Sequence, residues 1–446
     1  MSKTPIFDFV KKYSKSNSLR AHMPGHKGKT VLGVEKLDIT EIRGADVLYS
    51  ACGIIKQSEE NAAKLFGTCK TLYSTEGSSL AIRAMLLLSK KYAVSLGAKP
   101  KIAAARNVHK AFVTSAGILD LDVDFIYPHN NLNIITSGIS KNDFLNYLEH
   151  CEEKPTALYV TSPDYLGNIT DIKGLASVCK ENGILLLVDN AHGAYLNFLD
   201  NNLHPITLGA DLCCDSAHKT LPVLTGGAYL HISKKAAKFI KENAEDAMAL
   251  FASTSPSYLI LQSLDVANEY LKNYNKKLTA FVTELDKVKT KLLEFGYTLI
   301  GDESLKITVF AKDYGYLGTE LAEILIKKGI EPEFYDKDYL CLMLTPSNSK
   351  RDFDKILRVF KAIKKLPAKN EKAPRIEEPQ RSCSIHDAMF KDFEILAVSK
   401  CEGRIFADGA VSCPPAIPVI ISGEVITKNS IALMKYYGIK KCKVIK

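Results

Sequence analysis

From residue 73 to residue 232, short apolar runs alternate with longer segments of helical periodicity. Six apolar runs predict strands: KIAAA (101–105), VDFIY (123–127), ALYVT (157–161), ILLLV (184–188), DLCCDS (211–216) and GAYLHI (227–232). Helical stretches lie between most of them, at 78–96, 107–119, 141–153 and 171–183. Strands that are apolar on both faces and separated by helices are typical of a parallel or mostly parallel sheet. We therefore expect an α/β fold.

The pattern changes after residue 256. A long helical segment runs from about residue 256 to about residue 295, and a smaller α+β unit follows, with two strand-like runs and a helix that ends at Gly329. Proline and charged residues then predict a linker. The expected organisation is an N-terminal arm (1–50), a large domain (51–295), a small α+β domain (296–366), a linker (367–382) and a C-terminal segment that packs on the small domain (383–446).

Composition narrows the class of protein. The chain has 446 residues and a formal net charge of +9, but its lysines are spread along helical faces, so we do not expect nucleic-acid binding. The N-terminus lacks the apolar core of a signal peptide, and no apolar run is long enough to cross a membrane, so we expect a cytoplasmic protein. The eleven cysteines are scattered without a CxxC pair, which favours free thiols over a disulfide framework or a zinc site.

Candidate chemistry gathers around a lysine between two predicted strands. Lys219 follows the run DLCCDS, and Asp189 lies directly after the run ILLLV. Ligands of open α/β sheets bind at the carboxyl ends of the strands. Gly77, Ser78 and Ser79 open the first helical stretch, where backbone N–H groups and hydroxyls make a phosphate site. A lysine, an acid and a phosphate cradle are the parts of a pyridoxal phosphate site.

Each part also has a simpler interpretation. An aspartate at a strand end is commonly a turn or cap residue, Gly-Ser-Ser is commonly only a helix cap, and Ala-His-Lys can face the surface. Only the joint arrangement is specific. His22 and His26 are four residues apart, but Pro24 and Gly25 between them exclude a regular helix, so we do not expect a metal site there.

Eight motifs spread over most of the chain carry a resemblance to a known family. They are HMPGHKG (22–28), DITEIRGADVLYSACGIIKQSEENAAKLFG (38–67), EGSSLAI (76–82), ARNVHKA (105–111), VDNAHGAY (188–195), DSAHKTLPVLTGGA (215–228), STSPSYLILQSLDVA (253–267) and CPPAIPVIISGE (413–424). With these motifs the chain resembles the ornithine/lysine/arginine decarboxylase family, in a short form without a receiver-like domain. The family belongs to the fold-type I pyridoxal phosphate enzymes. The resemblance implies an aspartate aminotransferase-like large domain with a mostly parallel seven-stranded sheet.

The resemblance also implies roles for individual residues. Lys219 would hold pyridoxal 5′-phosphate as a Schiff base, Asp189 would pair with its pyridine nitrogen, and His109 would stack on its ring. His192 is the fourth predicted catalytic residue. The implied cofactor-binding residues are Gly77, Ser78, Ser79, His109, Asp189, Ala191, Ser216, His218, Lys219, Thr254 and Ser255. The last two would reach the phosphate of a neighbouring subunit, which implies a homodimer or higher homo-oligomer with shared active sites.

The chain departs from the family pattern mainly around the predicted substrate pocket. The departures are Ala45, Val47, Tyr49, Ala51, Gly226–Gly227 and Ala416. They leave the cofactor set intact. A cationic substrate needs an acidic or polar pocket, and the candidates for substrate contact are Asp46, Glu424, His22 and His26.

The predicted reaction depends on whether an arginine binds the carboxylate of the substrate. An arginine clamp would stabilise the carboxylate in the ground state and oppose its loss. Aminotransferases of this fold place such an arginine on a small-domain strand, but the run 339–349 has none, and the nearest is Arg351. We therefore predict decarboxylation of a cationic amino acid, arginine first and lysine or ornithine next, in polyamine biosynthesis. The alternatives are an aminotransferase or lyase, and a non-catalytic homologue that keeps the cofactor.

Overall fold

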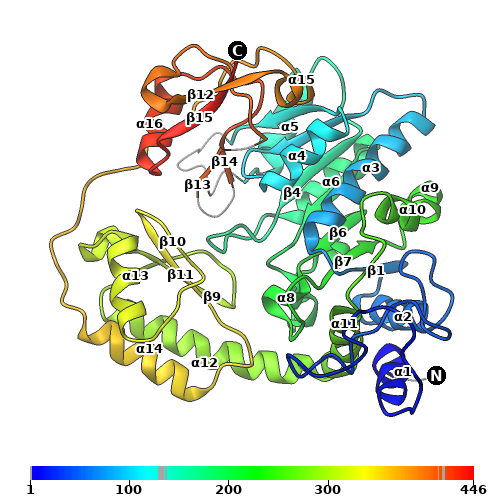
Figure 1. The fold of residues 1–446 in the computed structure, drawn as a ribbon. Coiled ribbons are helices and arrows are strands. Elements are labelled where there is room, and N and C mark those ends of the chain that lie inside the picture. Colours follow the sequence, from blue (N-terminus) through cyan, green and yellow to red (C-terminus); the bar gives the residue numbers. More distant parts are fainter. Residues whose placement is uncertain (1–2, 129–134, 136–137, 410, 414–416) are drawn as a thin grey trace. The chain divides into compact units, whose positions relative to one another are not determined.

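The computed structural model describes residues 3–128, 135, 138–409, 411–413 and 417–446. It confirms the α/β fold with a large, mostly parallel sheet of seven strands, in the order β1-β7-β6-β5-β4-β2-β3 (Figure 1). Strand β7 is antiparallel to both of its neighbours, whereas β5 pairs with β6, and β2 with β4 and β3, in parallel. The chain divides into two compact units, residues 1–99 with 172–276 and residues 100–171 with 277–446.

The first unit holds four strands of the large sheet: β1 (Lys70–Ser74), β7 (Ala228–Ile232), β6 (Leu212–Asp215) and β5 (Leu185–Asp189). Every residue of β5, β6 and β7 is buried, as expected for strands covered on both faces. Its helical elements are α1 (Pro5–Ser14), α2 (Ile54–Phe66), α3 (Ser78–Ser95), α6 (Ile172–Asn182), η2 (Ala194–Phe198), α7 (Pro205–Leu208), α8 (Ala217–Thr220), α9 (Lys238–Glu242), α10 (Ala244–Ala249) and α11 (Tyr258–Leu271), with the start of α12 (Tyr274–Glu294).

The second unit holds the strands β4 (Ala157–Thr161), β2 (Lys101–Ala105) and β3 (Asp122–Ile126), and a four-stranded antiparallel sheet of β10 (Phe334–Tyr335), β11 (Tyr339–Met343), β9 (Lys306–Phe310) and β8 (Thr298–Ile300). Two small sheets follow, β12 (Phe393–Ala397) with β15 (Lys441–Ile445), and β13 (Val411–Cys413) with β14 (Ile417–Ile420). Its other helical elements are α4 (Lys110–Ile118), α5 (Lys141–His150), η3 (Ala311–Tyr314), α13 (Gly318–Lys327), α14 (Lys350–Ala362), α15 (Ile385–Phe390), η4 (Val398–Lys400) and α16 (Lys428–Tyr436).

The structure confirms all six predicted strands to within one residue at each end. It adds a seventh, β1, which the apolar pattern did not reveal, because only Leu72 and Tyr73 of the five residues KTLYS are apolar. Pairing with β7 buries this strand all the same, and Thr71 Oγ1 lies 2.9 Å from Nδ1 of His231 on β7. The predicted helical segment 256–295 forms two helices, α11 and α12.

The C-terminal segment shares a core with the four-stranded sheet of its own unit. Phe334 of β10 and Cys341 of β11 belong to the same buried cluster as Phe406, Ile420 and Val444. The packing of residues 383–446 on the small domain, as part of the predicted domain division, stays a prediction. The predicted domain boundaries themselves stay a prediction, because the compact units group residues 100–171 with the C-terminal part of the chain.

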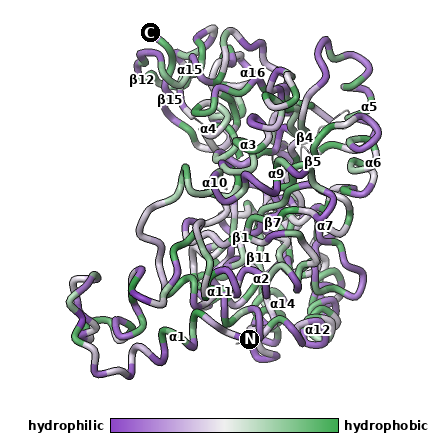
Figure 2. Tube along the Cα trace, turned by 90° about the vertical axis from the view of Figure 1, so that its right-hand side faces the viewer, coloured by the Kyte–Doolittle hydropathy of each residue, from purple (hydrophilic) through white to green (hydrophobic). Residues whose placement is uncertain are grey.

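No helix in the described part of the chain is both long and apolar enough to span a membrane. The long helix α12 carries hydrophilic and hydrophobic residues side by side (Figure 2).

A buried carboxylate ties the N-terminal helix to its unit. Asp265 of α11 is completely buried and accepts hydrogen bonds from the Phe7 backbone N–H (2.9 Å) and the Ser58 hydroxyl (2.6 Å). Burial raises the pKa of Asp265 to about 6, although these hydrogen bonds act in the opposite direction. The carboxyl group therefore binds its proton more tightly in the folded chain than in the unfolded chain.

This raised pKa predicts a pH-dependent loss of stability. Stability that Asp265 contributes in its protonated form is present below pH 4 and is lost as the pH rises through about 6. Relative to the variant Asp265→Asn, the free energy of unfolding of the wild type should fall by about 2 kcal/mol between pH 4.5 and pH 7. Chemical denaturation at the two pH values measures it, with Asp246→Asn, an exposed acid of the same unit, as the control. A parallel change in the wild type and Asp265→Asn would contradict the assignment.

Candidate active site

Lys219 lies in the turn that connects β6 to β7. Strand β6 ends at Asp215, and Lys219 sits in the short helix α8, where its backbone N–H donates to Ser216 O (3.0 Å). Its side chain is partly buried, and Nζ lies 2.9 Å from Nε2 of the buried His192. The Lys219 amine therefore has a polar partner within its own unit.

Asp189 occupies the last position of β5, opposite Cys214 of β6 in the sheet register. The carboxylate is buried, and its Oδ1 accepts from the Ala191 backbone N–H (3.1 Å) and from the Cys214 thiol (3.5 Å). Burial and the neighbouring Asp189 charge raise the pKa of the Cys214 thiol, so the thiol stays protonated and donates. One donor from the turn after β5 and one from β6 thus fix one oxygen of the predicted catalytic acid.

The predicted phosphate cradle lies at the N-terminus of the 18-residue helix α3. Gly77 precedes the helix with a φ of +72°, which favours glycine, and a Cβ built there would meet nothing within 4 Å. The Ser216 hydroxyl donates to the Ser78 hydroxyl at 2.8 Å, and Ser79 lies in the first turn. Open space, hydroxyls and helix N–H groups fit a phosphate. With the lysine and the buried acid, the donor set of this unit fits pyridoxal phosphate.

Other predicted cofactor residues have different surroundings. His218 Nδ1 lies 3.0 Å from Gly227 O. His109 belongs to the second unit, where it is the N-cap of α4 and its Nδ1 accepts from the Ala111 N–H (3.1 Å). Thr254 and Ser255 are exposed in the loop before α11.

Asp46, a predicted substrate residue, caps a helix. Its carboxylate is buried and accepts five backbone hydrogen bonds of 2.7–3.3 Å at the start of α2, from Val47, Cys52, Gly53, Ile55 and Lys56. This geometry favours a cap over a substrate contact. The departures around it lie on the same irregular segment, with Val47 exposed and Tyr49 at a φ of +71°.

Glu424, the other predicted acid, is buried in the second unit. Its carboxylate lies 3.7 Å from the buried Arg106 guanidinium and accepts from the Ile421 N–H at 2.8 Å. Arg106 also donates to the carbonyls of Pro418 (2.7 Å) and Val419 (3.3 Å). Burial raises the pKa of Glu424, and Arg106 opposes that shift. The pair anchors β14 within its unit, which favours a structural role. Ala416 lies outside the described residues.

His22 and His26 bind separate partners within the arm. His22 Nε2 lies 2.6 Å from the Tyr13 hydroxyl. His26 Nδ1 accepts from the Gly28 N–H (3.0 Å), so Nε2 carries the proton and donates to Asp38 (3.3 Å). Their predicted role in substrate binding stays a prediction.

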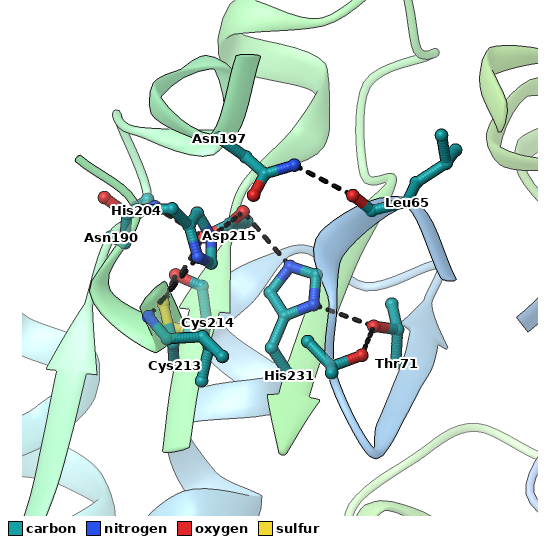
Figure 3. Close-up of polar contacts among 12 residues, drawn as sticks. Leu65, Thr71, Asn190, Asn197, His204, Cys213, Cys214, Asp215 and His231 are labelled. Atoms are coloured by element: carbon teal, nitrogen blue, oxygen red, sulfur yellow. Dashed lines mark hydrogen bonds and ion pairs between the residues drawn. The ribbon is translucent and has the colours of Figure 1, made fainter. Parts of the chain in front are cut away.

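Sequence reasoning missed a buried network next to these residues. Asp215 Oδ2 accepts from Nε2 of both His204 and His231 at 3.1 Å, and Oδ1 accepts from the Asn190 side chain at 2.7 Å (Figure 3). All four residues are fully buried. Burial raises the pKa of Asp215, but the two imidazoles outweigh it and hold this pKa well below its usual range. The sequence does show Asp215 as an acid at the end of an apolar strand. It contains no pattern that links Asp215 to His204 or His231.

Two histidines and an aspartate are also a common metal-ligand set. One possible ligand atom from each of His204, Asp215 and His231 lies within 4.8 Å of the other two, close enough to surround an ion. The tautomer of His204 argues against ligation. Its Nδ1 accepts from the backbone N–H of Ile206 (3.4 Å), so the proton sits on Nε2 and points at Asp215. A protonated nitrogen cannot bind a metal, and the cluster is therefore a hydrogen-bond network.

Comparison with known proteins adds independent evidence. A family model described as "Orn/Lys/Arg decarboxylase, major domain" matches residues 4–295, and "Orn/Lys/Arg decarboxylase, C-terminal domain" matches residues 371–442. The chain is 28% identical to arginine decarboxylase of Bacillus subtilis (strain 168), over 96% of this chain and 92% of that protein. It is 27% identical to arginine decarboxylase of Halalkalibacterium halodurans, over 97% and 93%.

Solved structures show the same fold. The lysine decarboxylase of Francisella novicida superimposes with a TM-score of 0.82 at 18% identity, over 99% of this chain and 81% of that chain. The constitutive lysine decarboxylase of E. coli gives a TM-score of 0.78 at 16% identity, over 99% and 82%. The family models, the relatives and the fold agree with the motifs around Lys219 and Asp189, and the chain belongs to the ornithine/lysine/arginine decarboxylase family.

Proposed function

We propose that this chain is a pyridoxal phosphate-dependent decarboxylase that converts a cationic amino acid into the corresponding amine and CO2. The observation that carries the proposal is the 2.9 Å contact between Lys219 and His192, in the same unit as Asp189 and the Ser78–Ser216 pair. The similarity to proteins named arginine decarboxylase supports arginine as the first substrate, with lysine or ornithine next. Such a reaction would serve polyamine biosynthesis.

The residues of the first unit divide the work. Pyridoxal phosphate, when bound, supplies an electron sink for the bond between Cα and the carboxylate. Lys219 is the nucleophile that holds the cofactor, and His192 orients its amine. Asp189 carries the negative charge that keeps the ring nitrogen protonated. The hydroxyls of Ser78 and Ser216 and the N–H groups of α3 bind the phosphate.

Decarboxylation is favoured over transamination by the small-domain strand. Strand β11 and the residues after it (339–349) contain no arginine, and Arg351 is exposed at the start of α14. Without an arginine clamp, the carboxylate is not stabilised in the ground state, which favours its loss. Asp46 and Glu424 both have structural partners, so we propose neither of them as the group that binds the distal cation of the substrate.

We further propose a cytoplasmic homodimer or higher oligomer with shared active sites. The segment that follows α1 forms no long helix or strand within the described residues. It exposes large apolar side chains: Leu19 (90%), Met23 (67%), Val31 (84%) and Leu32 (85%). A second copy of the chain that covers these exposed apolar side chains fits the family resemblance.

Product analysis tests the proposed reaction. The protein incubated with pyridoxal phosphate should convert arginine to agmatine fastest, and lysine or ornithine to cadaverine or putrescine more slowly. Asp189→Asn should lower turnover roughly 100- to 1,000-fold, since a preorganised charge at the reacting system is lost. A keto acid product would indicate an aminotransferase. Cofactor binding without turnover of any of the three amino acids would indicate the non-catalytic homologue.

Subunit mixing tests the shared site. Lys219→Ala and the double variant Thr254→Ala/Ser255→Ala should each be nearly inactive alone. Mixed in equal amounts, they should regain about one quarter of the wild-type rate, because half of the dimers are hybrids with one intact site. Mass spectrometry of differently tagged subunits confirms exchange. Confirmed hybrids with no regained activity would show that Thr254 and Ser255 do not serve the partner.

A further inference from the structure

Strand β6 supports the end of β5 from both faces of the sheet. Successive side chains of a strand point to opposite faces, so Cys214 and Asp215 reach different neighbours. Cys214 donates to Asp189 Oδ1 (3.5 Å), and Asp215 accepts from the side chain of Asn190 (2.7 Å). The turn that begins with the predicted catalytic acid is therefore held at two consecutive residues.

Asn190 is the link between the buried network and that turn. Its backbone N–H donates to Cys214 O (2.9 Å), and its carbonyl accepts from the Gly193 N–H (2.7 Å). Its side chain is completely buried, and its Oδ1 has no hydrogen-bond partner among the described residues. A Cβ built at Gly193 would overlap with this oxygen, so the turn is packed tightly against the amide. The bond to Asp215 fixes the amide orientation.

The network is built to keep its central carboxylate ionised and immobile. His204 donates from Nε2, as its tautomer requires, and His231 makes a second bond through Nδ1 to Thr71 (2.9 Å). Burial lowers the pKa of His231, although Asp215 opposes this shift, which favours the neutral imidazole. The Cys213 thiol adds a weak donor at 3.5 Å (Figure 3). The Asp215 carboxylate is thus surrounded by hydrogen-bond donors from side chains that are themselves buried.

We infer that Asp215, acting through Asn190, is a positioning residue that aims the Asp189 carboxylate at the ring nitrogen of the cofactor. The inference rests on the proposed function, because it takes the role of Asp189 from there. The hydrogen bonds from the two imidazoles fix the Asp215 carboxylate. The hydrogen bond between Asp215 and Asn190 then fixes Asn190, which directly follows Asp189 in the chain. Asp215 itself touches neither cofactor nor substrate.

The test compares two ligands of the apoprotein, pyridoxal phosphate and its 1-deaza analogue, which has carbon in place of the ring nitrogen. The ratio of their dissociation constants reports the contact between Asp189 and that nitrogen, and a general loss of packing would weaken both ligands equally. Asn190→Ala breaks the link while leaving both imidazole bonds to Asp215, and Asp215→Asn removes the charge. Asn197→Ala is the matched control, because its amide donates to Leu65 O (3.1 Å) outside the Asp215 contacts.

The wild type and Asn197→Ala should prefer pyridoxal phosphate, and Asp189→Ala should abolish the preference. Asn190→Ala and Asp215→Asn should reduce the preference about tenfold, as expected for coupled neighbours, with Asn190→Ala retaining the wild-type circular dichroism spectrum. Should Asp215→Asn fail to fold, Asn190→Ala alone decides. If Asp189→Ala removes the preference but Asn190→Ala keeps it in full, the positioning role is wrong. If the wild type shows no preference, the proposed role of Asp189 falls, and the inference falls with it.

Discussion

A fully buried negative charge organises the candidate site. Such a charge is tolerated only where hydrogen-bond donors surround it. The Asp215 carboxylate obtains them from three distant parts of the chain: His204 before α7, His231 on β7 and Asn190 after β5. Satisfying one carboxylate therefore joins the ends of neighbouring strands, and the turn that carries Lys219 begins directly after it.

The sheet explains how one strand serves both stability and chemistry. The alternation of side chains along β6 sends one thiol to Asp189 and the next carboxylate to the buried histidines. One face thus holds the predicted catalytic acid, Asp189, while the other face holds the buried network around Asp215. The same arrangement explains how Lys219 can follow an apolar strand. Strand β6 ends in the polar residue Asp215, and the Lys219 amine lies 2.9 Å from Nε2 of His192.

The sequence predicted those parts of the molecule whose signal is local. Apolar runs predicted six strands, and eight motifs, including the one around Lys219, indicated the family. Strand β1 was not predicted, because its burial comes from pairing with β7 and not from an apolar run. The hydrogen-bond partners of Asp215 were not predicted, because only folding brings His204 and His231 close to it. Asp46 has the residue type of a substrate contact, but its carboxylate binds backbone amides, which no sequence pattern distinguished.

The identity of the cofactor lysine is the central claim, and peptide mapping tests it most directly. Borohydride reduction of the protein loaded with pyridoxal phosphate fixes the cofactor to the lysine that holds it, and digestion followed by mass spectrometry locates the label. We expect a single labelled peptide that contains SAHKTLP, modified at Lys219. A label on a different lysine, with Lys219 unmodified in the same sample, would contradict the account.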